Sequence, residues 1–267
     1  MAELLARSAD GASVSALDDG EGPSLLLVHG GGESPAAWEG VARSLSRDFR
    51  VVRLARRIYV PGTCVPPSYS VAVEAEDILA IAGLLDRPLL LAGHSSGAIA
   101  VLEAAVRAPG VAAGLFLYEP PVPSHSLVGA EAARRARAAF AAGSPGEALR
   151  IHLRDIAREP PERVEEVLAR SEARTSFAAR VEAGLADIDA LDALGVGVDR
   201  YRRLAVPTTL VEGDRTSASL RERLADLAAT LPDARMVTLR GEGHTAHRTA
   251  PATLAHAIRE AAGRLPR

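Results

Sequence analysis

The chain has 267 residues, of which 48% are hydrophobic, so it can bury one large core and a small accessory region. Its formal net charge is −3 at pH 7, so it is not a strongly basic protein of the kind that binds nucleic acid or an anionic membrane surface. All of its basic residues are arginine, a bias that GC-rich coding explains, so no arginine is assigned a role.

The first residues and the single cysteine indicate the cellular compartment. Cys64 excludes a disulfide framework within the chain and is typical of a reducing interior. Residues 1–7 lack the basic start and the long apolar core of a signal peptide. No run reaches the ~18 apolar residues of a membrane span. We therefore expect a cytoplasmic protein without a membrane partner, and the sequence leaves its oligomeric state open.

Taken in chain order, the elements alternate between strands and helices. Short strand-like pieces within 4–19, around Asp10-Gly11, predict a hairpin at a sheet edge. The apolar run 25–28 is typical of a buried parallel strand, and Ser34-Pro35 predicts a helix start capped by the serine. Further strands are expected near 51–54, 89–92, 114–118, 208–211 and 235–239. This alternation predicts an α/β fold with a mostly parallel, doubly wound sheet.

One serine lies where a strand turns sharply into a helix. Gly93-His94-Ser95-Ser96-Gly97 follows the predicted strand 89–92 and precedes the helix-forming segment 98–106. A serine at the apex of such a strained turn requires glycine two residues to either side. The turn presents the hydroxyl at the carboxyl end of the sheet. Ser95 is therefore the predicted nucleophile.

A glycine-rich loop, His29-Gly30-Gly31-Gly32, follows the strand at 25–28. Because glycines let the backbone approach a carbonyl closely, the Gly31 amide can point at a developing oxyanion. The Ser96 amide would be the second donor. The alternative is a phosphate-binding loop, which the absence of a following Gly-Lys-Ser/Thr disfavours.

The third motif lies near the C-terminus, where Gly241-Glu242-Gly243-His244 follows the last predicted strand and Pro251 opens a helix through Leu265. A histidine in this loop is placed to act as general base. Together the three motifs resemble the α/β-hydrolase fold superfamily, from about residue 20 to the end except in the middle. The resemblance implies acyl transfer through Ser95 and His244, with no nucleotide or metal cofactor.

The acid that would orient His244 has two candidates. Family members usually carry an aspartate three residues after the glycine that ends the penultimate strand, here Gly213, but Thr216 occupies that position and Asp214 stands two residues early. Glu119 follows the strand 114–118 and precedes two prolines, where some families of this superfamily place the acid. Glu119 is favoured over Asp214, and a site without an acid stays open.

The middle of the chain differs in character. Residues 120–204 contain no convincing strand and hold three helical stretches, at 130–142, 146–158 and 161–190. They resemble the helical cap that many of these enzymes carry, so we expect a core of 1–119 and 205–267 with a cap of 120–204. The loop 55–62 departs from the family pattern and is expected to border the site.

Several other side chains are candidates for binding a substrate or a metal ion. Trp38, Tyr118 and His125 are candidate substrate contacts. His247 lies three residues after His244 and could form a metal pair with it. However, it is predicted to lie in a loop without nearby acidic ligands, so no metal site is expected. His94, before the nucleophile, is expected to pack rather than to react.

These features favour a serine hydrolase that acts on a small molecule and cleaves a carboxylic ester, lactone, thioester or amide of a small apolar substrate. Two alternatives stay open. One is a cofactor-free, non-hydrolytic enzyme of the same fold, such as a cyclase, lyase, acyltransferase or perhydrolase. The other is a catalytically silent ligand-binding protein.

Overall fold

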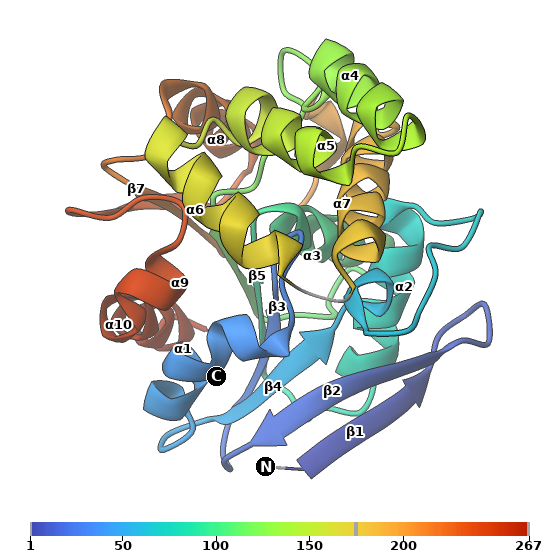
Figure 1. The fold of residues 1–267 in the computed structure, drawn as a ribbon. Coiled ribbons are helices and arrows are strands. Elements are labelled where there is room, and N and C mark those ends of the chain that lie inside the picture. The colour runs from blue at the N-terminus through green and yellow to red at the C-terminus, as the bar shows by residue number, and fades with distance from the viewer. Residues whose placement is uncertain (1, 174–175, 266–267) are drawn as a thin grey trace.

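A single sheet organises the molecule. In residues 2–173 and 176–265, which the computed structural model describes, eight strands pair in the order β1-β2-β4-β3-β5-β6-β7-β8 (Figure 1). The strands are β1 (Ala2–Arg7), β2 (Ser13–Asp19), β3 (Ser24–Val28), β4 (Arg50–Ala55), β5 (Leu89–His94), β6 (Gly114–Tyr118), β7 (Thr208–Gly213) and β8 (Ala234–Leu239). The β1–β2 hairpin and the β2–β4 pair are antiparallel, and the other pairs are parallel. The predicted edge hairpin and the mostly parallel sheet are confirmed.

The central strands β3, β5 and β6 are buried along their whole length. Their residues alternate between the two faces of the sheet. Leu26 and Val28 belong to a cluster with apolar residues of α2 (Val71–Ala82), α3 (Ser96–Arg107) and α8 (Ala218–Thr230). Leu25 and Leu27 belong to a second cluster, with α1 (Glu39–Leu45) and α10 (Pro251–Ala262). Because helices cover both faces, these strands read as continuous apolar runs.

One helix start differs from the sequence expectation. Ser34 does occupy the N-cap position, but of a short 3-10 helix, η1 (Pro35–Trp38), that precedes α1. Its side chain makes no capping hydrogen bond with the described residues, so the expected serine cap is wrong. The last helix is preceded by one further turn, α9 (Ala246–Thr249), and α10 begins at Pro251 as predicted.

The segment between β6 and β7 is helical, as expected. Its helices are α4 (Ala130–Ala141), α5 (Pro145–Ile151), a π-helical turn η3 (His152–Ile156), α6 (Pro161–Glu172), α7 (Phe177–Asp192) and the 3-10 turn η4 (Asp199–Tyr201). The single helix expected over 161–190 is instead α6 and α7, which run in different directions (Figure 1). Ser176 is the N-cap residue of α7, and positions 174–175 lie outside the described residues.

Figure 1 shows α4 to α7 gathered at the end of the sheet where β5 gives way to α3. This arrangement places the helical insert over the motifs at Gly31 and Ser95. Among the helices of residues 2–173 and 176–265, none combines the length and the apolar character that crossing a membrane requires.

Candidate active site

The turn at Ser95 has the strained geometry that the sequence predicted. Ser95 joins β5 to α3 with φ 53° and ψ −128°, a backbone conformation that residues with a side chain rarely adopt. A Cβ on Gly97 would overlap the carbonyl oxygen of His29, and one on Gly93 would overlap the backbone of Ala98. Glycine is therefore required on both sides of the serine because the backbones approach each other so closely.

Glu119 and His244 come together across 125 residues of sequence. The Nδ1 atom of His244 lies 2.6 Å from Oε2 of Glu119, which is fully buried. The other carboxylate oxygen, Oε1, accepts the Gly213 amide at 2.8 Å and the hydroxyl of Thr216. Thr216 is the residue that stands where family members usually have the acid. Here it orients the carboxylate that faces the histidine.

The alternative acid has another role. The Asp214 carboxylate accepts a hydrogen bond of 2.8 Å from the amide of Gly241, at an exposed turn. It therefore links the loop after β7 to the loop after β8. Of the two predicted candidates, the structure brings Glu119 against His244.

Glu119 and His244 shift each other's pKa. Burial disfavours the charged form of His244, but the hydrogen bond and the charge of Glu119 outweigh it and raise the pKa of His244 above 6.5. Burial would likewise raise the pKa of Glu119. The hydrogen bonds from His244, Thr216 and the Gly213 amide instead hold that pKa below its ordinary value. Glu119 is thus a carboxylate at neutral pH.

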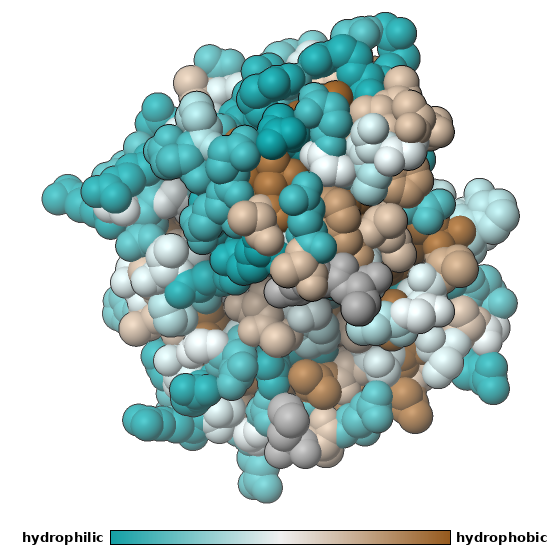
Figure 2. Space-filling view, viewed as in Figure 1, coloured by the Kyte–Doolittle hydropathy of each residue, from teal (hydrophilic) through white to brown (hydrophobic). Residues whose placement is uncertain are grey.

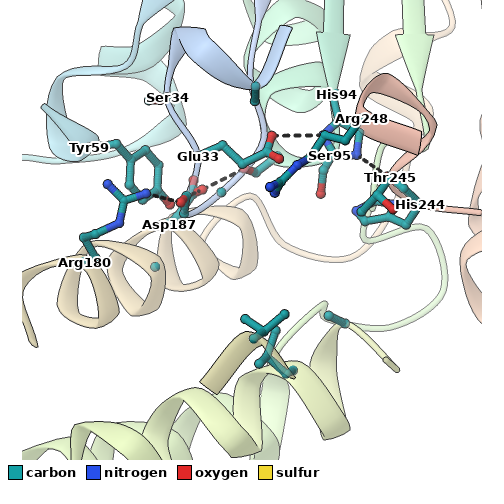
Figure 3. A pocket seen from close by; sticks show the side chains of 18 of the residues that line it. Glu33, Ser34, Tyr59, His94, Ser95, Arg180, Asp187, His244, Thr245 and Arg248 are labelled. Carbon is teal, nitrogen blue, oxygen red and sulfur yellow. Dashed lines mark hydrogen bonds and ion pairs between the residues drawn. The ribbon is translucent and has the colours of Figure 1, made fainter. Parts of the chain in front are cut away.

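Ser95 and His244 line one cavity of about 690 Å³, together with Gly31 and Ser96. Figure 3 shows Ser95 and His244 on the same wall, with helices of the insert across the open space. Within the described residues Ser95 makes no side-chain hydrogen bond to His244. Such bonds are often long without a substrate and tighten when one binds.

The insert supplies most of the apolar wall of this cavity. Its apolar lining residues include Leu149, Leu153, Val167, Phe177, Val181 and Ile188. In Figure 2 hydrophobic surface is visible in the hollow between α6 and α7, bordered by hydrophilic side chains. The cavity therefore offers an apolar interior beside Ser95 and a polar rim.

The three predicted substrate contacts lie elsewhere, because the cavity lining in the described residues includes neither Trp38, Tyr118 nor His125. Trp38 is completely buried beneath α9 and α10. The hydroxyl of Tyr118 donates to the Gly243 carbonyl and accepts the Ala246 amide at 3.0 Å, so it holds the loop that carries His244. His125 is exposed and pairs with Asp226.

A cluster of two histidines and a glutamate lies behind the nucleophile. His94 Nε2 donates to the carbonyl of His244 at 2.8 Å, and Nε2 of His247 lies 2.8 Å from Glu33. Glu33 also lies 3.5 Å from Nδ1 of His94. The expectation that His247 lies in a loop without an acidic ligand is therefore wrong: it lies on α9, and the chain brings Glu33 to it from the loop after β3.

The same three side chains are those of the described residues that could hold a metal ion, since their ligand atoms lie within 4.8 Å of one another. Hydrogen bonds to His247 and to the Gly30 amide account for the position of Glu33. The hydrogen bond to the His244 carbonyl accounts for the position of His94.

Sequence reasoning missed a buried ionic network beside the cavity, because it assigned no arginine a role. Arg56 is 1% exposed and pairs with Glu74 at 2.9 Å and with Asp187 at 2.7 Å. It also donates to the Ser96 hydroxyl at 2.9 Å. The departure of the loop 55–62 from the family pattern was the available signal. That loop does border the site, since its Tyr59 lines the cavity.

Comparison with known proteins places this geometry in a family context. A model of the alpha/beta hydrolase family matches residues 25–257. An alpha/beta hydrolase from Sphaerobacter thermophilus is 26% identical and superposes with a TM-score of 0.80 over 96% of this chain and 99% of that one. These matches confirm the predicted fold.

Curated relatives match in part. A pimeloyl-[acyl-carrier protein] methyl ester esterase from Methylococcus capsulatus is 33% identical over 172 residues, which are 54% of this chain and 64% of that protein. A probable oxidoreductase, EphD, from Mycobacterium tuberculosis is 33% identical over 112 residues, 40% of this chain. The match spans only 19% of the length of EphD.

Proposed function

Since the chain belongs to the alpha/beta hydrolase family, we propose that it is a serine hydrolase that cleaves a carboxylic ester, lactone, thioester or amide of a small apolar substrate. One observation carries the proposal. The Glu119–His244 pair, at 2.6 Å, lies beside a strained serine turn, and Ser95 and His244 line the same cavity.

In the proposed reaction His244 takes the proton of the Ser95 hydroxyl, whose oxygen attacks the substrate carbonyl. Glu119 accepts the Nδ1–H of His244. This bond leaves the Nε2 lone pair free to act as base. The amides of Gly31 and Ser96 stabilise the oxyanion, and each such donor contributes roughly two to three powers of ten in rate. His244 then protonates the leaving group, and water releases the acid from Ser95 by the same steps.

The insert, which we assign as a cap over 120–204, supports an apolar substrate. Its side chains form an apolar wall beside Ser95, so an acyl chain could bury there and exclude water from the reacting carbonyl. The similarity to the methyl ester esterase from Methylococcus capsulatus favours an ester over an amide. The acyl group is expected to face the insert, with the leaving group toward the polar rim.

The test is intact-mass analysis after incubation with a generic fluorophosphonate. We expect one adduct on the wild type and none on Ser95→Ala. A folded wild type that forms no adduct would contradict the proposal. A screen of p-nitrophenyl esters and acyl thioesters in ¹⁸O-labelled water then follows. A hydrolase places one solvent oxygen in the acid product, whereas a cyclase, lyase or acyltransferase does not.

A further inference from the structure

A carboxylate from the insert reaches the turn that carries the nucleophile. Asp187 lies on α7, is 3% exposed, and accepts hydrogen bonds at both oxygens. Its Oδ2 accepts from the Ser96 hydroxyl at 2.7 Å and from the Tyr59 hydroxyl at 2.8 Å, while Oδ1 accepts from Arg56 at 2.7 Å. Figure 3 shows Asp187 beside Tyr59 at the cavity wall. Ser96, the residue next to the nucleophile, is thus hydrogen-bonded to the insert.

The same carboxylate also lies close to the glycine loop. A Cβ built on Gly31 would lie 3.1 Å from Oδ2 of Asp187 and 3.5 Å from the Ser96 hydroxyl oxygen. Asp187 is therefore hydrogen-bonded to Ser96 and lies beside Gly31, where it leaves little room for a side chain. One carboxylate thus lies next to both segments whose amides are assigned to the oxyanion.

A negative charge at this place would oppose an oxyanion unless it were balanced. Arg56 balances it, since its guanidinium contacts Asp187 and the Ser96 hydroxyl, at 2.7 and 2.9 Å. Burial would raise the pKa of Asp187, but the charge and hydrogen bond of Arg56 hold it below its ordinary value. The carboxylate is therefore ionised, paired and saturated with donors, which suits a fixed support rather than a proton donor.

We propose that Asp187 is a positioning residue for the oxyanion site. With Arg56 it anchors the Ser96 side chain beside the Gly31 loop, so the helical insert completes the site as well as covering it. The proposal rests on the proposed function, because it needs Ser95 to be the nucleophile.

The test measures how fast a fluorophosphonate inactivates each variant, with kinact and KI determined separately. Asp187→Ala is expected to lower kinact about 10- to 100-fold with KI little changed, because misplaced donors act mainly on the transition state. Asp187→Asn is expected to recover most of this loss. Its amide nitrogen can donate to the hydroxyls of Ser96 and Tyr59 while its oxygen still accepts from Arg56.

Ser96→Ala provides a second route if Asp187→Ala does not fold, since it leaves the Arg56–Asp187 ion pair in place. We expect kinact to fall about 10-fold, and an unchanged kinact in Ser96→Ala would overturn the proposal. Where Asp187→Ala folds, the double variant is expected to lose little more than Asp187→Ala alone, because both changes remove the same contact. Full additivity of the two changes would overturn the proposal.

Asp192→Asn is the matched control on the same helix. The Asp192 carboxylate accepts the amides of Val128, Gly129 and Ala130, so its loss perturbs the insert without touching Ser96. We expect an unchanged kinact. If the wild type is labelled at Ser95 and Asp187→Ala is labelled equally fast, this inference alone is overturned. It is also overturned if kinact falls as much in Asp192→Asn as in Asp187→Ala. An unlabelled wild type would overturn the proposed function and this inference with it.

Discussion

Three donors hold the Glu119 carboxylate, namely His244, the Gly213 amide and the Thr216 hydroxyl. A buried carboxylate that accepts several hydrogen bonds stays ionised and keeps one orientation. Glu119 also has a φ of 49°, a strained conformation for a residue with a side chain. From the end of β6 its side chain reaches His244 in the loop after β8. Glu119 therefore meets both demands on a triad acid, a fixed charge and a fixed direction.

Replacing Glu119 by glutamine is expected to lower kcat by roughly four powers of ten while the fold persists. The amide can donate to Nδ1 of His244 and so favour the tautomer that leaves no base facing Ser95. Hydrolysis of a p-nitrophenyl ester measures the effect. Asp214→Asn, the matched control, is expected to keep nearly full activity, since Asp214 bonds to the Gly241 amide. The reverse order of the two variants would show that Asp214 is the acid.

The raised pKa of His244 predicts the acid limb of the pH profile. A general base works only when neutral, so kcat/KM should fall as the pH is lowered through the pKa of His244, with a midpoint above 6.5. Substituting glutamine for Glu119 removes the charge that raises this pKa. The midpoint of the residual activity should then move to lower pH. The assignment of His244 as the general base would be contradicted if kcat/KM did not change between about pH 6 and 8. It would also be contradicted if the midpoint were the same in Glu119→Gln as in the wild type.

At the scale of elements, the turn between β5 and α3 depends on a backbone contact. Gly97→Ala would drive its Cβ into the carbonyl of His29, and neither backbone can move away without shifting β3 or α3. We expect a loss of about 1–3 kcal/mol in the free energy of unfolding, with loss of labelling at Ser95. Denaturant unfolding and fluorophosphonate labelling measure the two effects.

Gly184→Ala makes the same chemical change in a helix, where no atom of the described residues beyond the adjoining backbone of that helix lies within 4 Å of the added Cβ. It should increase the free energy of unfolding by about 1 kcal/mol, because alanine favours the helical state. Equal effects of the two substitutions would contradict the argument from backbone contact.

The elements most readily predicted from the sequence are those whose burial gives a local signal. β3 and β5 are continuous apolar runs, each followed by a glycine turn, so both strands and both turns could be predicted. The division between α6 and α7 carried no such signal, since neither glycine nor proline lies between Glu172 and Phe177. An apolar pattern that continues across a break predicts one helix where the chain forms two.

At the scale of the whole molecule, the contacts that complete the site join distant positions. Glu119 could be named as a candidate because some families of this superfamily carry the acid after the strand that is β6 here. Arg56 and Asp187 are 131 residues apart, and each is an ordinary charged residue in its own surroundings. Local patterns therefore predict the residues expected to react, while the support around them becomes visible only when the insert is packed on the sheet.

The buried histidines make the stability of the molecule depend on pH. Burial, and then the charge of Arg56, lower the pKa of His29 to about 4; burial and the neighbouring histidines do the same for His94. In the unfolded chain both would bind a proton near pH 6.5. Their stabilising effect is thus complete above about pH 6.5 and is lost as the pH falls toward about 4. His244, whose pKa is raised, acts in the opposite direction.

We therefore expect the free energy of unfolding to be smaller at about pH 5 than at about pH 7.5, with each of the two histidines contributing on the order of 2 kcal/mol. Urea unfolding at a series of pH values measures the slope. His29→Gln is the informative variant, because its amide oxygen can accept the Arg56 amide that now meets Nε2 of His29. It should be less stable near neutrality but lose less stability on acidification. An unchanged slope in His29→Gln would show that His29 is not the group that takes up the proton on unfolding.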